Sequence, residues 1–196
     1  MSQDKFLKMQ QLIDVEKLTS GEREELLALG ILSNELTVQP SPRYGTDRPG
    51  IAKRAVHAAK VLNEAYDYFP RPSSFSRALA FEIGGHKVVL ISGTASVDEE
   101  GKTIHLGDFR AQCWRTYRNI TNILEAEKMT WRDIVRTTCY LRDIERDYDA
   151  FNEVRTTFFK FLNLDPLPAS TGIQAILCRS DLLIEIEAIA VCPVVS

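Results

Sequence analysis

Two glutamates near the end of the chain have the type and spacing that could support chemistry. Glu185 and Glu187 alternate with apolar residues in the run from Leu182 to Ala190, a period of two that predicts a strand with Ile184 and its apolar neighbours on the opposite face. A carboxylate in a sheet requires water, a partner or a ligand. We therefore expect function on the carboxylate face, while the apolar face requires a covering layer.

The thiols and imidazoles do not suggest a metal site. The cysteines lie far apart and form no CxxC pair, and no histidines are closely spaced, so we expect no structural zinc. We interpret the cysteines as reduced residues packed as small apolar groups. The residues concerned are Cys113, Cys139, Cys178 and Cys192, with His57, His86 and His105.

Charge and hydrophobicity restrict the partners. The 196 residues carry a net charge of -3, which gives no reason to expect nucleic acid or an anionic membrane as partner. Arginines with Asp and Glu nearby are interpreted as a solvated face rather than an RNA-binding surface. The N-terminus lacks the pattern of a signal peptide, and no apolar run approaches the length of a membrane span. We therefore expect a soluble, cytoplasmic protein. The arginines are Arg110, Arg115, Arg118, Arg132, Arg136 and Arg142.

The chain has two regions that differ in the pattern of their apolar residues. Residues 1–71 show helical spacing and predict an extension of three helices, over residues 6–18, from Thr19-Ser20-Gly21-Glu22 onward, and over residues 51–66. Residues 72–196 predict one α+β domain in the order ββαβαββ, a mixed sheet with two helices on one face. Its strands are expected at 75–83, 87–97, 134–141, 171–178 and 183–191, and its helices at 108–128 and 147–162.

These elements carry short motifs that together resemble the Rid/YjgF family, the reactive-intermediate deaminases also described as endoribonuclease L-PSP. The resemblance covers residues from about Pro72 to Cys192 and implies a chorismate-mutase-like fold, usually a homotrimer with clefts between subunits. The carboxylate face would then look toward such a cleft. The motifs are Ile91-Ser92-Gly93, Phe109, Gln112, Asn119, Leu124, Phe151-Asn152-Glu153, Phe158-Phe159, Pro168-Ala169 and residues 184–190.

Several expected site residues differ from the family. The deaminases have an arginine that pairs with the substrate carboxylate, and Ser170 stands at that position. Phe75 replaces a tyrosine, Thr94 a glutamine and Gly172 a cysteine. A guanidinium can bind a carboxylate through two parallel hydrogen bonds, whereas a serine hydroxyl can donate one weaker hydrogen bond to it. We therefore expect an atypical member, with Ser170 as a ligand hydrogen-bonding residue rather than a nucleophile.

The matching positions supply the rest of the predicted site. The resemblance implies that Glu185 helps hold the attacking water, with Gly93 and Asn152 shaping the pocket. Arg77, where the family usually has glutamine, is predicted to share a strand face with Phe75. We hypothesise that Arg77 supplies an anion contact that Ser170 cannot, against the alternative of a solvated or interface arginine.

Three functions remain open from the sequence. The first is a hydrolase or deaminase-like enzyme acting on an imine, enamine or related carboxylate metabolite. The second is a non-catalytic metabolite-binding or regulatory trimer, which the missing arginine and tyrosine hydroxyl favour. The third is a chorismatase-like hydrolase, suggested by residues 168–173, although those relatives are usually much longer. None of the three implies a cofactor.

Overall fold

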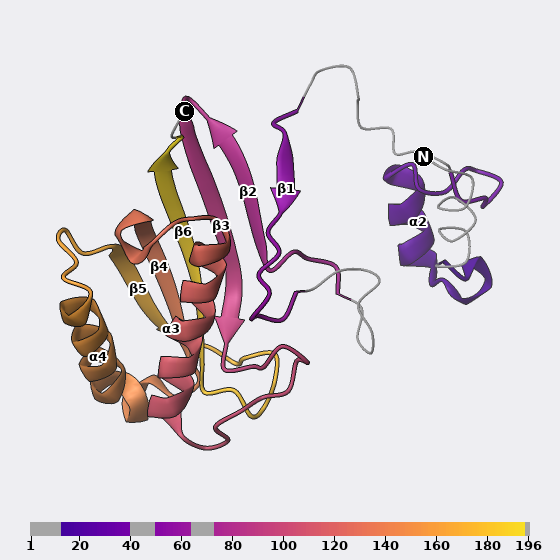
Figure 1. The fold of residues 1–196 in the computed structure, drawn as a ribbon. Coiled ribbons are helices and arrows are strands. Elements are labelled where there is room, and N and C mark those ends of the chain that lie inside the picture. The colour runs from indigo at the N-terminus through magenta and orange to yellow at the C-terminus, as the bar shows by residue number, and fades with distance from the viewer. Residues whose placement is uncertain (1–12, 40–49, 64–72, 195–196) are drawn as a thin grey trace. The chain divides into compact units, whose positions relative to one another are not determined.

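The computed structural model describes residues 13–39, 50–63 and 73–194 (Figure 1). The chain divides into two compact units, residues 1–50 and residues 51–196. The described part of the first unit holds a short 3₁₀ helix, η1 (Val15–Lys17), and helix α2 (Ser20–Ala28). Most of the helix predicted over residues 6–18 lies outside the described residues.

Helix α2 begins where the sequence predicts. The Thr19 hydroxyl accepts a hydrogen bond from the Glu22 amide at 3.2 Å, and the Glu22 carboxylate accepts one from the Thr19 amide at 2.7 Å. This reciprocal arrangement is a capping box, which satisfies two backbone donors that a helix start leaves without partners. The pairing fixes the helix start locally.

The second unit is built on one six-stranded sheet in the order β1-β2-β3-β6-β4-β5. Among the described strands, only β4 and β5 run parallel, and helix α4 provides the crossover that a parallel pair needs. The strands are β1 (Lys53–Ala55), β2 (Ala78–Ile83), β3 (His86–Ala95), β4 (Ile134–Leu141), β5 (Ala169–Gln174) and β6 (Ile184–Pro193). The helices are α3 (Phe109–Ala126), α4 (Ile144–Phe161) and the 3₁₀ helix η2 (Trp131–Asp133).

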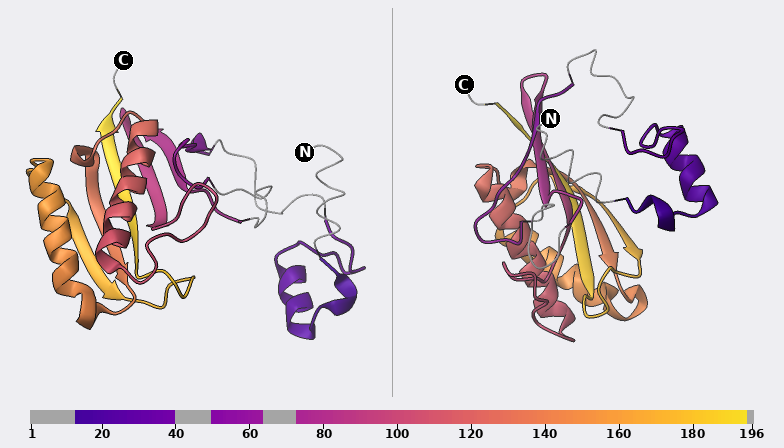
Figure 2. Two further views of the ribbon diagram at one scale, coloured as in Figure 1. Left: turned by 60° about the horizontal axis from the view of Figure 1, so that its bottom comes forward. Right: turned by 90° about the vertical axis from the view of Figure 1, so that its right-hand side faces the viewer.

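Helices α3 and α4 cover the same face of this sheet (Figures 1 and 2). In β6, Ile184 and Ile186 are fully buried toward the core, while Glu185 and Glu187 alternate with them and remain half-buried. The predicted order ββαβαββ, with two helices on one face of a mixed sheet, is confirmed. The carboxylate face of β6 is therefore the face that these helices leave uncovered.

The helix predicted over residues 51–66 is wrong for its described part. Residues 53–55 form β1, which pairs antiparallel with β2, and residues 56–63 form neither helix nor strand. The Arg54 guanidinium holds β1 in place through two hydrogen bonds to the Glu127 carboxylate, at 2.7 and 2.6 Å. Val56 follows β1, and Val61 lies in a turn in which its amide bonds the Ala58 carbonyl; both valines reach the core. Sheet pairing has thus overridden a helical spacing of apolar residues.

The turns of the domain follow their residue types. Gly84 and Gly85 join β2 to β3 with φ values of 56° and 73°, a left-handed conformation that glycine adopts without steric cost. Asp108 caps α3 by accepting from the Ala111 amide at 3.0 Å, and Asp143 caps α4 by accepting from the Arg146 amide at 3.1 Å. These features fix the starts of the elements that carry the site.

Candidate functional site

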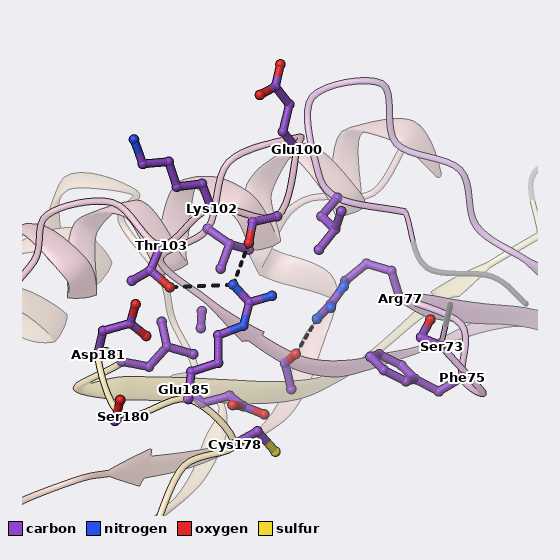
Figure 3. A pocket seen from close by; sticks show the side chains of 17 residues that line it. Ser73, Phe75, Arg77, Glu100, Lys102, Thr103, Cys178, Ser180, Asp181 and Glu185 are labelled. Atoms are coloured by element: carbon purple, nitrogen blue, oxygen red, sulfur yellow. Dashed lines mark hydrogen bonds between the residues drawn. The ribbon is translucent and has the colours of Figure 1, made fainter. Parts of the chain in front are cut away.

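A cavity of about 790 Å³ opens beside the ends of β3 and β6 (Figure 3). Four of the residues predicted from the sequence line it, and loop residues on either side complete its wall. The predicted residues are Phe75, Arg77, Gly93 and Glu185. The structure therefore brings half of the predicted site together within one chain.

Glu185 lies directly against Gly93. A Cβ at position 93 would meet the Glu185 Oε1 at 1.8 Å, so the carboxylate occupies the space that any other residue's side chain would need. The register between β3 and β6 shifts between Ile91 and Thr94, which places Gly93 in an irregular part of the strand. Glycine at this position is a steric requirement for the observed placement of the carboxylate.

Arg77 and Phe75 precede β2 rather than lying in it. The predicted strand began at Phe75, whereas β2 begins at Ala78, so the expected shared strand face does not exist. The two side chains still meet, because the Arg77 guanidinium lies 5.3 Å from the centre of the Phe75 ring. Arg77 is only 7% exposed and donates a hydrogen bond to the Gly93 carbonyl. It therefore lies beside the glycine on which Glu185 packs.

Thr94 is buried and is not among the residues that line this cavity. Its hydroxyl donates to the Ser92 carbonyl at 2.8 Å, and the Ser92 hydroxyl donates to the Ser76 carbonyl at 2.8 Å. The first bond lies within the irregular part of β3, and the second ties this part of the strand to the segment before β2. In this chain, Thr94 positions the Gly93 backbone.

Asn152, Ser170 and Gly172 form a second group, between α4 and the edge strand β5. Ser170 accepts a hydrogen bond from the Thr137 hydroxyl at 3.0 Å. Gly172 lines a separate, open cavity of about 440 Å³, and a Cβ at this position would meet Tyr148 Cε2 at 4.0 Å. The two cavities share no lining residue. The structure thus keeps this group apart from Glu185 within the single chain.

Arg155 is a member of the second group that sequence reasoning missed. It donates to the Asn152 side-chain oxygen at 2.5 Å and to the Ser170 hydroxyl at 3.3 Å, and its guanidinium lies 4.8 Å from the centre of the Phe151 ring. The available signal was its position three residues after Asn152 on a predicted helix, which places both on one face. Arg155 brings a positive charge to Ser170, the position at which the resemblance predicts an arginine in the deaminases.

Cys139 lies beside Ser170 but is not an activated thiol. Its sulfur is 4.0 Å from the Ser170 hydroxyl, and burial raises the pKa of the Cys139 thiol above its usual range. A thiol with a raised pKa stays protonated at neutral pH, and the thiolate is the nucleophilic form. Cys139 is therefore a packing residue.

A second feature missed from the sequence is the role of two arginines, Arg142 and Arg115. Arg142, predicted to lie on a solvated face, instead donates to the backbone carbonyls of Arg179 and Leu182. Arg115, from the same predicted face, is buried, and it donates to the Val97 carbonyl at 3.2 Å. Arg179 lines the larger cavity. These arginines have structural partners far away in the sequence.

Glu187 takes a structural place on β6. It lies opposite Thr138 of β4, and burial together with a hydrogen bond to Glu187 raises the pKa of the Tyr140 hydroxyl.

Throughout residues 13–39, 50–63 and 73–194, no three or more His, Cys, Asp or Glu side chains are grouped to hold a metal ion. No helix within the same ranges is long and apolar enough to cross a membrane.

Comparison with known proteins places this geometry among related chains. A RutC family protein from Pyrococcus abyssi is 33% identical over 102 residues, which cover 52% of this chain and 76% of that protein. The 3-aminoacrylate deaminase RutC of Acinetobacter baylyi is 32% identical over 103 residues, 53% of this chain and 78% of the relative. The 2-iminobutanoate/2-iminopropanoate deaminase of Salmonella typhimurium is 33% identical over 104 residues, 53% of this chain and 79% of the relative.

Solved structures agree on the fold. The YjgF gene product of E. coli is similar with a TM-score of 0.53 and 25% identity, covering 70% of this chain and 98% of that one. Yeast Mmf1 is similar with a TM-score of 0.57 and 21% identity, covering 71% and 98%. The model of the family described as Endoribonuclease L-PSP matches residues 71–192, more than half of the chain. The chain therefore belongs to the endoribonuclease L-PSP family of the Rid/YjgF superfamily.

Proposed function

We propose that this protein is a small-molecule hydrolase that deaminates an imine, enamine or related carboxylate metabolite. The observation that carries the proposal is the Glu185 carboxylate, held against Gly93 in a cavity of about 790 Å³. A carboxylate in a partly desolvated site can act as a general base toward water. Glu185 is thus the proposed catalytic residue.

The proposed reaction is hydrolysis of a carbon–nitrogen double bond. Glu185 takes a proton from water as the water oxygen bonds to the imine carbon and the carbon–nitrogen π electrons move to nitrogen. Glu185 returns this proton to the nitrogen, which gives a carbinolamine with a hydroxyl and an amino group on one carbon. Glu185 then moves the hydroxyl proton to the amino group as the carbon–oxygen double bond forms, so that the carbon–nitrogen bond breaks and ammonia leaves a carbonyl product. An enamine enters this sequence after tautomerising to the imine. Water supplies every atom that is added, and no oxidant or reductant is needed.

Two relatives support the substrate class. Their names describe deaminases of 3-aminoacrylate and of 2-iminobutanoate and 2-iminopropanoate. Each of these molecules combines a nitrogen-bearing carbon with a carboxylate. A ligand of this kind fits a site that holds Glu185 for water and cationic side chains for the carboxylate. Arg77 is one proposed anion contact, as its place in the cavity allows.

The proposal includes a homotrimer in the cytoplasm, with no nucleic-acid or membrane partner. The separation of the two groups of site residues supports it, because Glu185 and Gly93 lie in one cavity while Ser170, Asn152 and Gly172 lie elsewhere. A cleft between subunits would join the Glu185 group of one subunit to the Ser170 group of its neighbour. We also propose residues 72–196 as the Rid-like domain, with residues 1–71 as an extension to it.

A non-catalytic metabolite-binding trimer is the second candidate function. The observation that favours it is the hydroxyl of Ser170, which already accepts hydrogen bonds from Thr137 and Arg155 and cannot grip a carboxylate as a guanidinium does. In that case Glu185 would contact a ligand without activating water. The two functions differ in whether loss of the carboxylate removes turnover or affinity.

The test measures both properties in one variant. Glu185→Gln should release ammonia from freshly generated 2-iminobutanoate about 10²–10⁴-fold more slowly than wild type, the usual contribution of a general base. Binding of 2-oxobutanoate, measured by calorimetry, should change far less. Glu187→Gln is the matched control, because it removes a carboxylate from the same strand face. Wild-type ammonia release that Glu185→Gln leaves unchanged would contradict the proposal.

A further inference from the structure

The turn at residues 179–183 forms a rigid part of the wall of the larger cavity. The buried Gln112 side chain donates to the Asp181 carbonyl at 2.9 Å and accepts from the Leu183 amide at 2.8 Å. The Arg142 guanidinium donates to the Arg179 and Leu182 carbonyls. Two side chains from other elements thus fix the backbone of this turn without any ligand. A side chain on such a backbone is pre-organised.

The Arg179 side chain extends from this turn to the opposite loop. Its Nη1 donates to the Gly101 carbonyl and, at 3.5 Å, to the Thr103 hydroxyl, as the dashed line to Thr103 shows (Figure 3). Among the described residues, no hydrogen-bond acceptor is found for Nε or Nη2, and no ion pair includes Arg179. The edge formed by Nε and Nη2 therefore has donors available for a ligand.

Among the charged side chains that line the cavity, Arg179 is the cation best placed to contact a ligand. The Glu100 carboxylate and the Lys102 ammonium point away from Arg77 and Glu185 (Figure 3). Asp181 is exposed on the same turn and forms no ion pair within the described part of the chain. Arg77 is 7% exposed and donates to the Gly93 carbonyl, whereas Arg179 is half-buried. Arg179 is thus the more accessible guanidinium.

We propose that Arg179 is the residue that binds the carboxylate of the ligand in this cavity. A guanidinium edge with two parallel N–H groups matches a carboxylate in a bidentate pair. The site selects small 2-oxo and 2-imino acids, with the carboxylate on Arg179 and the reacting carbon toward Glu185. The statement about the reacting carbon depends on the proposed function, whereas the carboxylate contact stands without it.

The test compares the binding of a charged ligand with that of its uncharged amide. Calorimetric binding of 2-oxobutanoate and of 2-oxobutanamide is measured for wild type, Arg179→Gln and Arg179→Lys. We expect Arg179→Gln to weaken the acid about 10- to 100-fold, the range of a lost charge-assisted pair, and to leave the amide nearly unchanged. The affinity of Arg179→Lys for the acid should lie between those of wild type and Arg179→Gln, because lysine keeps the positive charge but cannot form the bidentate pair. Arg118→Gln, an exposed site on α3, is the control.

The outcomes separate the contact from a purely structural arginine. Equal losses for acid and amide would mean that Arg179 only ties the two loops together, and this would overturn the proposal. So would unchanged acid binding in Arg179→Gln, or the absence of acid binding in wild type. Arg77→Ala in the same assay tests the separate hypothesis for Arg77. Ammonia release in Glu185→Gln decides the proposed function independently of these binding results.

Discussion

At the scale of single residues, the site depends on one close approach. The Glu185 carboxylate fills the space beside Gly93, and Arg77 and Thr94 hold the glycine's backbone region from the other side. The resemblance identified Gly93 and Glu185 from the sequence. It did not identify Arg155, although its position three residues after Asn152 on a predicted helix was a signal. It could not identify Arg179, because the Gly101 carbonyl that Arg179 bonds is 78 positions away.

Gly93→Ala should displace the carboxylate and reduce ammonia release nearly as far as Glu185→Gln does. The added Cβ would lie 1.8 Å from Glu185 Oε1, so the glutamate side chain must move. We expect a cost in unfolding free energy of about 1–3 kcal/mol, typical of overpacking, measured by urea denaturation. Gly21→Ala, where a Cβ meets no atom within 4 Å, is the control. An active Gly93→Ala protein would contradict this account of the site.

At the scale of elements, local patterns were sufficient where the contacts are local or periodic. The alternation in β6, the helical stripes of α3 and α4 and the capping residue Thr19 all predicted their elements. The helix prediction failed over residues 51–63, where apolar residues at helical spacing lie in a short strand followed by a loop with a turn. What decides its structure is pairing with β2 and an ion pair to Glu127, 73 positions from Arg54.

The Arg54–Glu127 pair predicts a pH-dependent stability. The Arg54 hydrogen bonds, outweighing burial, lower the pKa of Glu127 below its ordinary value of 4.5. The pair therefore stabilises the fold fully above pH 4.5, and its contribution is lost as pH falls through the lower folded-state pKa. Arg54→Gln should cost about 1–3 kcal/mol at neutral pH, because it leaves a buried carboxylate with Lys87 as its remaining cationic partner.

Thermal unfolding of both proteins between neutral and acid pH measures this effect. The difference in Tm between wild type and Arg54→Gln should shrink as the pH falls below 4.5. Arg110→Gln is the control, because its partner Glu153 is exposed and such pairs contribute about 0–1 kcal/mol. A Tm difference that stays constant with pH would refute the role given to the pair.

At the scale of the whole molecule, the site is divided. One chain places Glu185 and Arg179 in one cavity, and Ser170 with Arg155 at the edge of the sheet. The proposed trimer would join the two parts. It would also cover the sheet face that the helices leave uncovered. The sequence indicated the family and the departure at Ser170, but the division into two groups becomes visible only in the fold.

The measurement that tests the central claim most directly is ammonia release from imines freshly generated by an amino-acid oxidase. Wild type and Ser170→Arg are compared with spontaneous hydrolysis. We predict that wild type accelerates release without an arginine at position 170, because Glu185 provides the base and Arg179 the carboxylate contact. Activity that appears only in Ser170→Arg would contradict the account, since it would mean that the scaffold is competent but that the natural chain does not deaminate.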